Sequence, residues 1–231
     1  MIHKRVLASL VFLFFFCKEN PESNKILSEA IKAYGGVENL QKYNHNQSTW
    51  SVNSPIKGKS EETRYISLPE KARIQSGANQ EIRIFNKDTV YRGKYGEKAI
   101  KVTGHLSESI KLQFLRMYSP LQLVNLKKNI SMTTMGIDHN ILEFNFDGSK
   151  IKYYFNNKTN LIDKTESLLN VGGREMKFIA NYGEYKEVNG VMVAHTEKKY
   201  INEMHTADNT LEEIKINASI DSSLFESYIK F

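Results

Sequence analysis

The sequence contains a single cysteine, Cys17, and residues 18–231 contain none. A fold held together by disulfides is therefore excluded, and so are zinc sites built from pairs of cysteines. A chain of this length can bury a sizeable hydrophobic core without such cross-links. No stretch rich in proline, glycine or serine interrupts residues 24–231, and no repeat is present. One domain is the simplest organisation.

Motifs that carry enzyme chemistry are absent from the sequence. It has no His-Glu-x-x-His, no Cys-x-x-Cys, no Walker loop and no Gly-x-Ser-x-Gly. The adjacent acids Glu61-Glu62 and Glu212-Glu213 fall in expected strands, where neighbouring side chains point to opposite faces. Neither pair therefore forms a carboxylate dyad, and we expect each to supply surface charge. The sequence predicts no catalytic residue, and an envelope hydrolase is the least favoured class.

A metal centre is not indicated either. The histidines are scattered, and His195 and His205 only flank the same strand region. Two histidines without a further acidic or sulfur ligand nearby make a weak metal site, so we expect them to be solvent-exposed. The sequence predicts no metal and no cofactor.

The sequence also has only a small excess of positive over negative charge. Lysine and arginine total 32 against 26 aspartates and glutamates. Without Lys4 and Arg5 of the leader, 30 basic and 26 acidic residues leave a net charge of +4. The basic pairs at 127–128 and 198–199 are isolated, whereas a nucleic-acid surface requires a clustered basic stripe. The sequence predicts no nucleic-acid partner.

The N-terminus has the pattern of an export signal. Lys4 and Arg5 precede an apolar run, residues 6–16, in which Ser9 is the only polar side chain. This run is too short to span a bilayer, which requires about 17–25 helical residues. Cys17 follows the run directly, where a bacterial lipoprotein signal is cleaved. The pattern predicts that the Cys17 thiol is lipidated with diacylglyceryl and fatty acyl groups such as palmitate, and becomes the mature N-terminus.

A second interpretation stays open, because residues 14–16 are phenylalanines where signal peptidases favour small residues. Cys17 would then be removed with the signal or remain as a free thiol. Under the lipoprotein interpretation, residues 1–16 are a signal peptide, 17–23 a lipid-anchored tether and 24–231 a single domain. Two or more acyl chains anchor a protein stably. Lys18 replaces the aspartate that favours inner-membrane retention, so the expected location is the cell envelope, at the outer membrane rather than the inner.

Helical periodicity appears in two places. Leu27, Ala30, Ile31 and Tyr34 recur at three- and four-residue spacing, and the pair at 35–36 is Gly-Gly, which ends a helix. One or two further helical turns are expected over 37–43. A second helical stretch is expected over 107–127. Ser119-Pro120 in its middle has the pattern of an N-cap followed by a first-turn proline, which predicts two short helices with a bend.

The rest of the chain has the two-residue period of strands. Leu142, Phe144 and Phe146 alternate with polar residues, residues 147–148 are an Asp-Gly turn signal, and the alternation resumes from Ile151. This is the clearest expected hairpin. The other expected strands are 46–54, 60–68, 71–77, 80–86, 88–92, 98–103, 161–169, 176–182, 191–200 and 210–217, with a closing turn at 221–225.

These elements predict an α+β fold. Antiparallel strands at about ten-residue spacing form a strongly curved sheet, an incomplete β-barrel, and the N-terminal and mid-chain helices cover its concave face. The concave face is either an ordinary packed core or the lining of a ligand cavity. The candidate lining residues are Leu142, Phe144, Phe146, Ile151, Tyr153, Phe155, Met176 and Phe178.

Two segments carry a resemblance to a known family. The first, residues 30–40, reads AIKAYGGVENL, and the second, 182–193, reads YGEYKEVNGVMV, followed by the ending at 216–225. Together they resemble the outer-membrane lipoprotein-sorting proteins, the LolA/LolB-like family. The resemblance implies an open antiparallel barrel with a helical lid around an apolar cavity that binds acyl chains without catalysis. Arg64 and Arg73 are the candidates for the family's lid-holding arginine, and a surface salt bridge is the alternative for either.

The resulting hypothesis is a membrane-anchored bacterial lipoprotein, monomeric, that binds the acyl chains of a lipid or lipoprotein for transfer or acceptance in the envelope. Its expected partners are the membrane, through Cys17, the acyl chains and an envelope carrier protein. A Cys17 anchor favours the membrane-bound acceptor type over the soluble carrier. The alternative is a non-transporting surface lipoprotein that uses the same fold, with a filled cavity, as a protein-interaction module.

Overall fold

The computed structural model describes residues 21–146 and 149–227. The expected export signal, the lipidation site Cys17 and the Asp147-Gly148 turn lie outside the described residues. The helices are α1 (Pro21–Ala33), α2 (Val37–Tyr43), α3 (Gly104–Leu115) and α4 (Pro120–Asn125), with short 3-10 turns at Gly77–Asn79, Lys127–Asn129 and Ser222–Phe225. Helix α1 includes the last residues of the expected tether.

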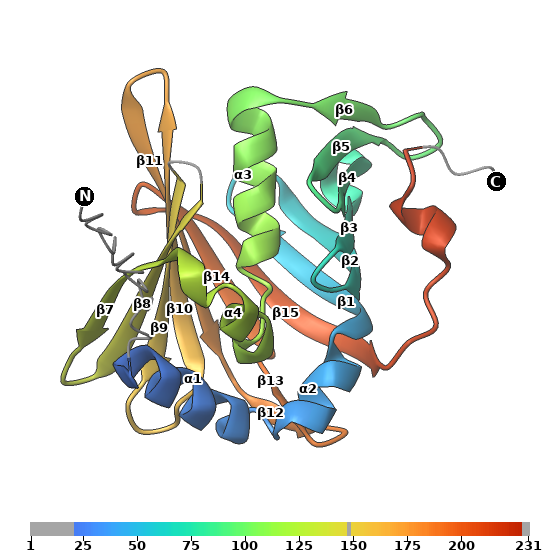
Figure 1. Ribbon diagram of the computed structural model, residues 1–231. Coiled ribbons are helices and arrows are strands. Elements are labelled where there is room, and N and C mark those ends of the chain that lie inside the picture. Colours follow the sequence, from blue (N-terminus) through green and yellow to red (C-terminus); the bar gives the residue numbers. More distant parts are fainter. Residues whose placement is uncertain (1–20, 147–148, 228–231) are drawn as a thin grey trace, which may run out of the picture.

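A single curved antiparallel sheet dominates the described part of the chain (Figure 1). It has thirteen strands in the order β6-β5-β4-β3-β2-β1-β15-β14-β11-β10-β9-β8-β7, and its edges β6 and β7 do not pair with each other. The concave side of this sheet is called the trough below. The strands are β1 (His45–Ser54), β2 (Gly58–Ser67), β3 (Lys71–Ser76), β4 (Glu81–Asn86), β5 (Thr89–Lys94), β6 (Ile100–Val102), β7 (Ile130–Met135), β8 (His139–Phe146), β9 (Ser149–Asn156), β10 (Ile162–Val171), β11 (Arg174–Gly183), β14 (Thr196–Ile201) and β15 (Met204–Ile216).

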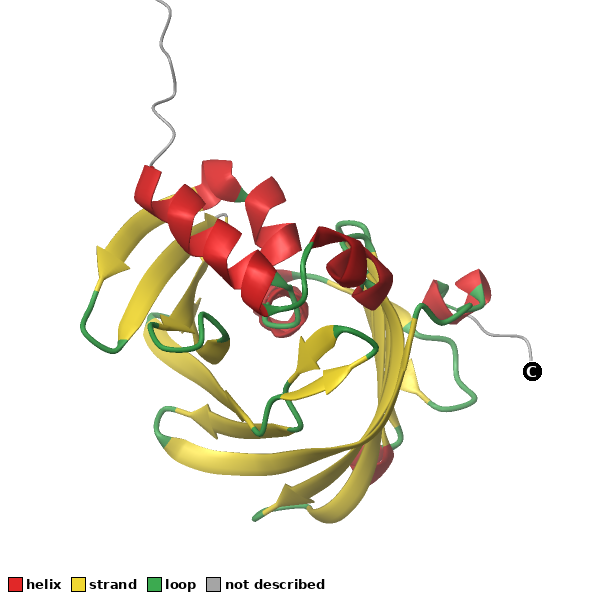
Figure 2. Ribbon diagram, turned by 90° about the horizontal axis from the view of Figure 1, so that it is seen from below, coloured by secondary structure: helices red, strands yellow, loops and turns green. Residues whose placement is uncertain are grey.

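Two further strands, β12 (Lys186–Val188) and β13 (Val191–Val193), form a separate hairpin. Figure 2 shows this hairpin lying across the lower opening of the trough. The expected strand 191–200 is therefore wrong as one element. It is broken at residues 194–195, where the chain passes from the hairpin into the large sheet.

The predicted fold class is confirmed, since the helices lie over the concave face of an open antiparallel sheet (Figure 2). The predicted hairpin is present as β8 and β9, with Leu142 opposite Tyr153 and Phe144 opposite Ile151. Three strand segments escaped the sequence prediction. Strands β7 and β12 were not expected, and β15 begins at Met204, well before the expected residue 210.

The bend in the mid-chain helices follows from the local sequence. Pro120 occupies the first turn of α4, where a missing backbone N–H costs nothing. Ser119 caps the helix, and its backbone N–H donates to Gln122 Oε1 at 3.0 Å in a capping box. Both residues are buried, so the cap also fixes how α4 enters the core. The predicted pair of short helices with an N-cap at Ser119 is confirmed.

The main core fills the space between these helices and the sheet, and it includes side chains from β2, β3 and β5 as well as from β8, β9 and β10. Ile26 of α1, Phe114 of α3 and Leu123 of α4 pack against side chains of β8, β9 and β10, and all are at most 3% exposed. Each buried apolar side chain of this size stabilises the fold by about 1.5–3 kcal/mol. None of the helices that the structure describes has the length and apolar content needed to cross a membrane.

The two segments that carry the family resemblance contact each other. Asn39 Nδ2 donates to the backbone oxygens of Gly35, at 2.9 Å, and Gly190, at 3.1 Å. Gly35 has φ +107°, and a Cβ built on it would lie 1.9 Å from the Gly190 oxygen. Only glycine fits there, because the conformation is unfavourable for other residues and no room is left. The junction of α1 and α2 is thereby fixed against the β12–β13 turn.

Candidate functional site

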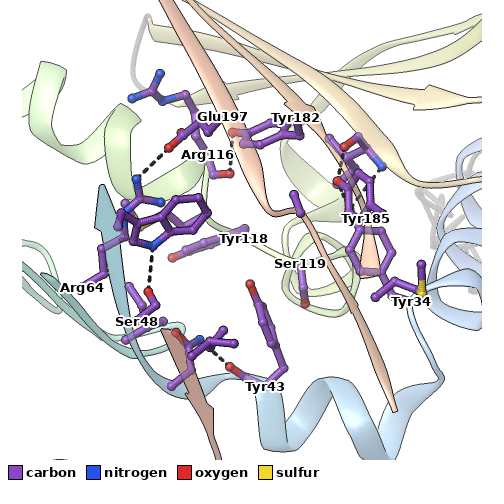
Figure 3. Close-up of a pocket in the computed structure, with 18 residues that line it drawn as sticks. Tyr34, Tyr43, Ser48, Arg64, Arg116, Tyr118, Ser119, Tyr182, Tyr185 and Glu197 are labelled. Atoms are coloured by element: carbon purple, nitrogen blue, oxygen red, sulfur yellow. Dashed lines mark hydrogen bonds and ion pairs between the residues drawn. The ribbon is translucent and has the colours of Figure 1, made fainter. Parts of the chain in front are cut away.

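An aromatic pocket lies inside the trough and is called the tyrosine cavity here (Figure 3). Its volume is about 100 Å³. Figure 3 shows Tyr43 and Tyr118 between Arg64 on one side and the Tyr34–Tyr185 pair on the other. The full lining is Tyr34, Tyr43, Asn46, Ser48, Trp50, Arg64, Ile66, Arg116, Met117, Tyr118, Ser119, Ile162, Tyr182, Tyr185, Met192, Ala194, Glu197 and Ile214.

One wall of the cavity is a closed hydrogen-bond arrangement. The hydroxyls of Tyr34 and Tyr185 lie 3.1 Å apart, Tyr185 donates to the Ile162 carbonyl, and the Ile162 N–H donates to Tyr34 Oη at 3.2 Å. Burial raises the pKa of both phenols above its ordinary value. Both stay neutral, so this wall presents ring faces to the cavity and keeps its polar atoms paired.

A short segment between α3 and α4, residues 115–118, covers the cavity and is called the lid turn. Three tyrosine hydroxyls fasten it to the sheet. Tyr153 donates to the Leu115 carbonyl at 2.6 Å and Tyr182 to the Arg116 carbonyl at 3.2 Å. Tyr118 of the lid turn donates to the Pro69 carbonyl at 3.0 Å. The Leu115 carbonyl also accepts from the Tyr118 backbone N–H at 3.0 Å, so Tyr153 adds a second bond to it. The Arg116 carbonyl lies just past the end of α3, where it has no partner within the helix, and Tyr182 supplies one.

A buried ion network crosses the trough beside the tyrosine cavity. Arg64 of β2 contacts Glu62 through Nε and Glu197 of β14 through Nη2, both at 2.7 Å. These three side chains are no more than 10% exposed. Lys199 Nζ lies 3.3 Å from Glu197, and the Arg64 guanidinium lies 4.3 Å from the centre of the Trp50 ring. The surface interpretations of Arg64 and Glu62 are therefore wrong, although Glu61 is exposed as expected.

The network keeps its charges in spite of its burial. Burial alone would raise the pKa of Glu197, but Lys199, Arg64 and Arg116 together lower that pKa below its ordinary value. The pKa of Glu62 is lowered for the same reason, by Lys199 and Arg64 against the effect of burial. Burial would likewise lower the pKa of Arg64, yet the two carboxylates raise it. The trough is therefore charged at its centre at neutral pH, and it is not a uniformly apolar groove.

Two larger hollows adjoin the tyrosine cavity. The charged chamber, about 350 Å³, shares Arg116, Met117 and Glu197 with the cavity. The outer hollow, about 390 Å³, lies beside α3 and shares Tyr118 with the cavity. Leu115 lines the outer hollow as well. The lid turn thus forms part of the wall of all three spaces.

The residues predicted from the sequence as cavity lining lie in the main core. Five of them, Leu142, Phe144, Ile151, Tyr153 and Phe155, are at most 2% exposed beneath the helices. Phe146 and Phe178 pack against the same cluster, and Met176 lies opposite Leu169 on the same face. None of the eight lines the tyrosine cavity, and Phe146 lines the outer hollow. Their role as a ligand lining stays a prediction.

The two candidate arginines lie on opposite faces of the sheet. Arg64 faces the trough, whereas Arg73 of β3 is only 1% exposed and donates to the Leu224 carbonyl at 2.9 Å. The C-terminal segment with Phe225 covers that outer face, where it packs against Ile82 and Ile84 (Figure 1). Arg73 is therefore a buried contact to the chain's end and not a surface salt bridge. Arg64 is bonded to strand carboxylates and not to the lid turn.

The histidines singled out in the sequence make separate local contacts. His195 Nδ1 lies 3.0 Å from the Val193 carbonyl, and His205 Nε2 lies 3.1 Å from Asp208. Both rings are partly buried rather than fully exposed. Within 21–146 and 149–227, no three histidine, cysteine or acidic side chains lie close enough to hold a metal ion.

Sequence reasoning missed most of the cavity. Tyr34, Tyr182 and Tyr185 lie inside the two segments that carry the family resemblance, so a signal for them was present. The sequence held no such signal for Arg116 and Tyr118, because both lie in an expected helical stretch, where a single polar or aromatic residue is common. Glu197 and Arg64 are separated by 133 positions, and nothing local indicates that they meet.

Comparison with known proteins supports the fold. Three crystal structures are similar over 88% of this chain. The first is a LolA superfamily protein from Nitrosomonas europaea, with a TM-score of 0.55, 11% sequence identity and 96% of that chain covered. The second is a putative outer membrane lipoprotein-sorting protein domain from Vibrio parahaemolyticus, with a TM-score of 0.56, 7% identity and 97% of that chain covered. The third is a DUF1329 family protein from Desulfovibrio piger, with a TM-score of 0.56, 14% identity and 97% of that chain covered. No known family's sequence pattern matches the chain, and no curated protein matches it. The likeness predicted from the sequence is confirmed at the level of the fold.

Proposed function

We propose that this protein is a lipid-anchored envelope lipoprotein that binds the acyl chains of a lipid or lipoprotein inside the trough, for transfer or acceptance. The observation that carries the proposal is the position of the lid turn in the walls of three adjoining hollows. The fold likeness to an outer membrane lipoprotein-sorting domain supports it.

Binding requires the lid turn to move. Ligand pockets typically measure 300–1,000 Å³, whereas the tyrosine cavity alone measures about 100 Å³. Displacement of residues 115–118 would join this cavity to the charged chamber and the outer hollow, each of which is within that range. The resulting space would also expose the predicted lining, since Tyr153 is one of the residues that fasten the lid turn.

Apolar burial would supply the affinity. Each CH2 group transferred from water contributes about 0.8 kcal/mol. Tyrosine rings suit such a lining because their faces are apolar while their hydroxyls satisfy backbone carbonyls. Movement of the lid turn would cost the three tyrosine bonds, at about 1 kcal/mol each. A few buried CH2 groups would offset that cost.

Anchoring through Cys17 would set the orientation at the membrane. Four peptide units separate Cys17 from Pro21, where α1 begins. At about 3.3–3.6 Å per residue they reach roughly 14 Å at most. A lipidated Cys17 would therefore hold the N-terminal end of α1 close to the bilayer surface. Lys18 after the cysteine favours the outer membrane over the inner.

A protein-interaction module is the second candidate, and the β7 edge favours it. Met132 and Met135 on this edge strand are 40% and 50% exposed, and Ile137 in the following turn is 95% exposed. Edge strands with apolar side chains readily pair with other proteins. In this alternative the trough stays filled and the surface carries the function.

Extraction of the purified protein tests lipid binding. Residues 18–231 would be expressed in the envelope of a bacterial host, purified without detergent and analysed by mass spectrometry for co-purified lipids. We expect acyl lipids, and displacement of the neutral fluorophore N-phenyl-1-naphthylamine by oleyl alcohol. A protein that is lipid-free in every preparation and binds neither compound would contradict the proposal and favour the interaction module.

Fractionation of cells tests the anchor separately. The full chain should sediment with membranes, and Cys17→Ser should release it to the soluble fraction. Mass analysis of the native N-terminus should show residue 17 as the first residue, carrying acyl groups. An unchanged membrane fraction for Cys17→Ser would exclude the lipid anchor but leave acyl binding in the trough untouched.

A further inference from the structure

The charged chamber carries more positive than negative side chains. Its charged lining residues are the cations Lys57, Arg83, Arg116 and Lys199 and the anions Glu62 and Glu197. Four positive and two negative charges leave an excess of two. A net charge on the wall of an enclosed space acts more strongly than the same charge in open water, because the protein screens it less.

Most of these charges are already paired. Arg64 and Lys199 together match the two carboxylates of the ion network. Arg83 Nε contacts Glu81 at 2.8 Å, and its Nη1 donates to Gln113.

Arg116 differs from these residues. Its guanidinium makes no hydrogen bond or ion pair with any residue that the structure describes, although it is partly buried and lowers the pKa of Glu197 from a distance. Its five N–H donors are available to a ligand.

A second polar group of the same chamber also lacks a partner. Asn209 of β15 lines the chamber and is 1% exposed. Its Nδ2 donates to Glu197 at 3.2 Å, whereas its buried Oδ1 has no hydrogen-bond partner among residues 21–146 and 149–227. Buried polar atoms are nearly always bonded, so this unpartnered acceptor calls for a donor in the chamber, such as a water molecule or a hydroxyl of a head group.

Arg116 lies at the junction between polar and apolar spaces. It lines both the charged chamber and the tyrosine cavity, and so does its neighbour Met117. The Tyr182 hydroxyl holds its backbone carbonyl, while the side chain extends towards Glu197 (Figure 3). A molecule that spans the junction would have one end among charged groups and the other among aromatic rings.

We propose that the ligand is an amphiphile with an anionic head group, which binds Arg116 in the charged chamber while its acyl chain enters the space beneath the lid turn. This inference rests on the proposed function. The shared chemistry is an oxyanion, which is either the carboxylate of a fatty acid or the phosphate of a phospholipid. Guanidinium groups bind both through parallel N–H···O bonds.

A neutral ligand fits this chamber less well. It would displace water from Arg116 and give no acceptor of equal strength in return, which leaves a charged donor group short of partners. An anion would instead restore charge balance to a wall that has an excess of cations. The head group therefore contributes selectivity, and the acyl chain contributes the bulk of the affinity.

Four ligands with one oleyl or oleoyl chain test the inference by titration calorimetry below their aggregation concentrations. Oleate and oleoyl-lysophosphatidylglycerol are anionic, whereas oleyl alcohol and monooleoylglycerol are neutral. We expect at least one anionic ligand to bind about tenfold more tightly than its neutral counterpart, the effect of one charge-assisted hydrogen bond. Tighter binding of oleate would identify the head group as a carboxylate, and tighter binding of oleoyl-lysophosphatidylglycerol would identify it as a phosphate.

The variant Arg116→Gln should remove this preference, with the affinity for the anionic ligands falling about tenfold to the level of their neutral counterparts. Arg174→Gln is the matched control, because Arg174 is an exposed arginine at the start of β11 that lines none of the three hollows. Equal binding of anionic and neutral ligands by the natural sequence would overturn the head-group inference but support acyl binding. Failure of all four ligands to bind would contradict the proposed function, and the inference with it.

Discussion

The Tyr182 hydroxyl donates a hydrogen bond to the Arg116 carbonyl across 3.2 Å, although 66 positions separate the two residues. Tyr182 belongs to β11 at the centre of the sheet, and Arg116 belongs to the lid turn. Burial raises the pKa of this phenol to about 12, so it remains a hydrogen-bond donor at neutral pH. One bond thereby holds the cover of the cavity and positions the side chain that we assign to the head group.

Tyr182→Phe should loosen the lid turn. The variant keeps the ring but removes the hydroxyl's bonds to Thr165 and to the Arg116 carbonyl. Only the second bond holds the lid turn, and its loss of about 1 kcal/mol corresponds to roughly a fivefold rise in the open population. Amide hydrogen exchange at residues 115–118 should speed up by that factor. The apparent affinity for oleyl alcohol should rise as well, because a larger fraction of the protein is binding-competent.

Tyr91→Phe is the control for this variant, since Tyr91 packs in the outer-face cluster away from the lid turn. Its exchange rates at 115–118 should match the natural sequence. If the exchange rates at residues 115–118 were the same in Tyr182→Phe as in the natural sequence, the Tyr182 hydroxyl would not hold the lid turn.

Glu197→Gln should lower the free energy of unfolding substantially. Removal of one partner from a buried ion pair leaves the other charge uncompensated, at a cost of about 3 kcal/mol or more. Urea denaturation measures this loss. Glu213→Gln is the matched control, because Glu213 pairs with Lys215 on the surface, where both side chains are more than 60% exposed, and such pairs contribute little. Equal losses in the two variants would contradict a structural role for the ion network.

Gly35→Ala should destabilise the protein by more than its conformation alone explains. The added methyl would collide with the Gly190 oxygen at 1.9 Å, so the junction of α1 and α2 has to move away from the β12–β13 turn. We expect a loss of at least about 2 kcal/mol. Gly172→Ala, at φ +59° with open space around it, isolates the conformational cost of about 1 kcal/mol. The contact would be unimportant if both variants lost the same amount in thermal denaturation.

Acid should weaken the protein through Glu81. Burial would raise the pKa of this carboxyl, but Arg83 and Arg92, each 2.8 Å away, lower it from 4.5 to about 2. A carboxyl with a lowered pKa stabilises the folded state above its unfolded-state pKa, and that contribution is lost as the pH falls from about 4.5 towards 2. Unfolding experiments across this range should show a steeper decline than in Glu81→Gln. Identical pH profiles would exclude the contribution.

Much of the secondary structure could be predicted because it depends on neighbouring residues. Alternation of large apolar side chains marked β8 and β9, and Ser119-Pro120 marked the break before α4. Strand β7 escaped because it is an edge strand in which no side chain is fully buried, so its sequence ISMTTM needs no strict alternation. The first half of β15 escaped because inward positions such as Asn209 are polar and serve the ion network.

The candidate site was less accessible to sequence reasoning than the fold. The eight predicted lining residues were chosen for their hydrophobicity, and hydrophobicity finds the core beneath the helices. The hollows instead occur where packing is interrupted by charged and hydroxyl-bearing side chains, such as Arg64, Glu197 and Tyr118. A pattern of apolar residues cannot distinguish a filled interior from one that leaves space.

The sequence by itself determined where the helices and most of the strands form, and that the sheet is antiparallel and curved. These properties follow from the side-chain period of each backbone conformation and from turn residues next to one another in the chain. Only the tertiary structure decided that Arg64 meets Glu197, that three tyrosines hold the lid turn, and that the Arg116 guanidinium is left without a partner among the described residues. Such contacts join residues far apart in the chain, and their strength comes from the burial that folding creates.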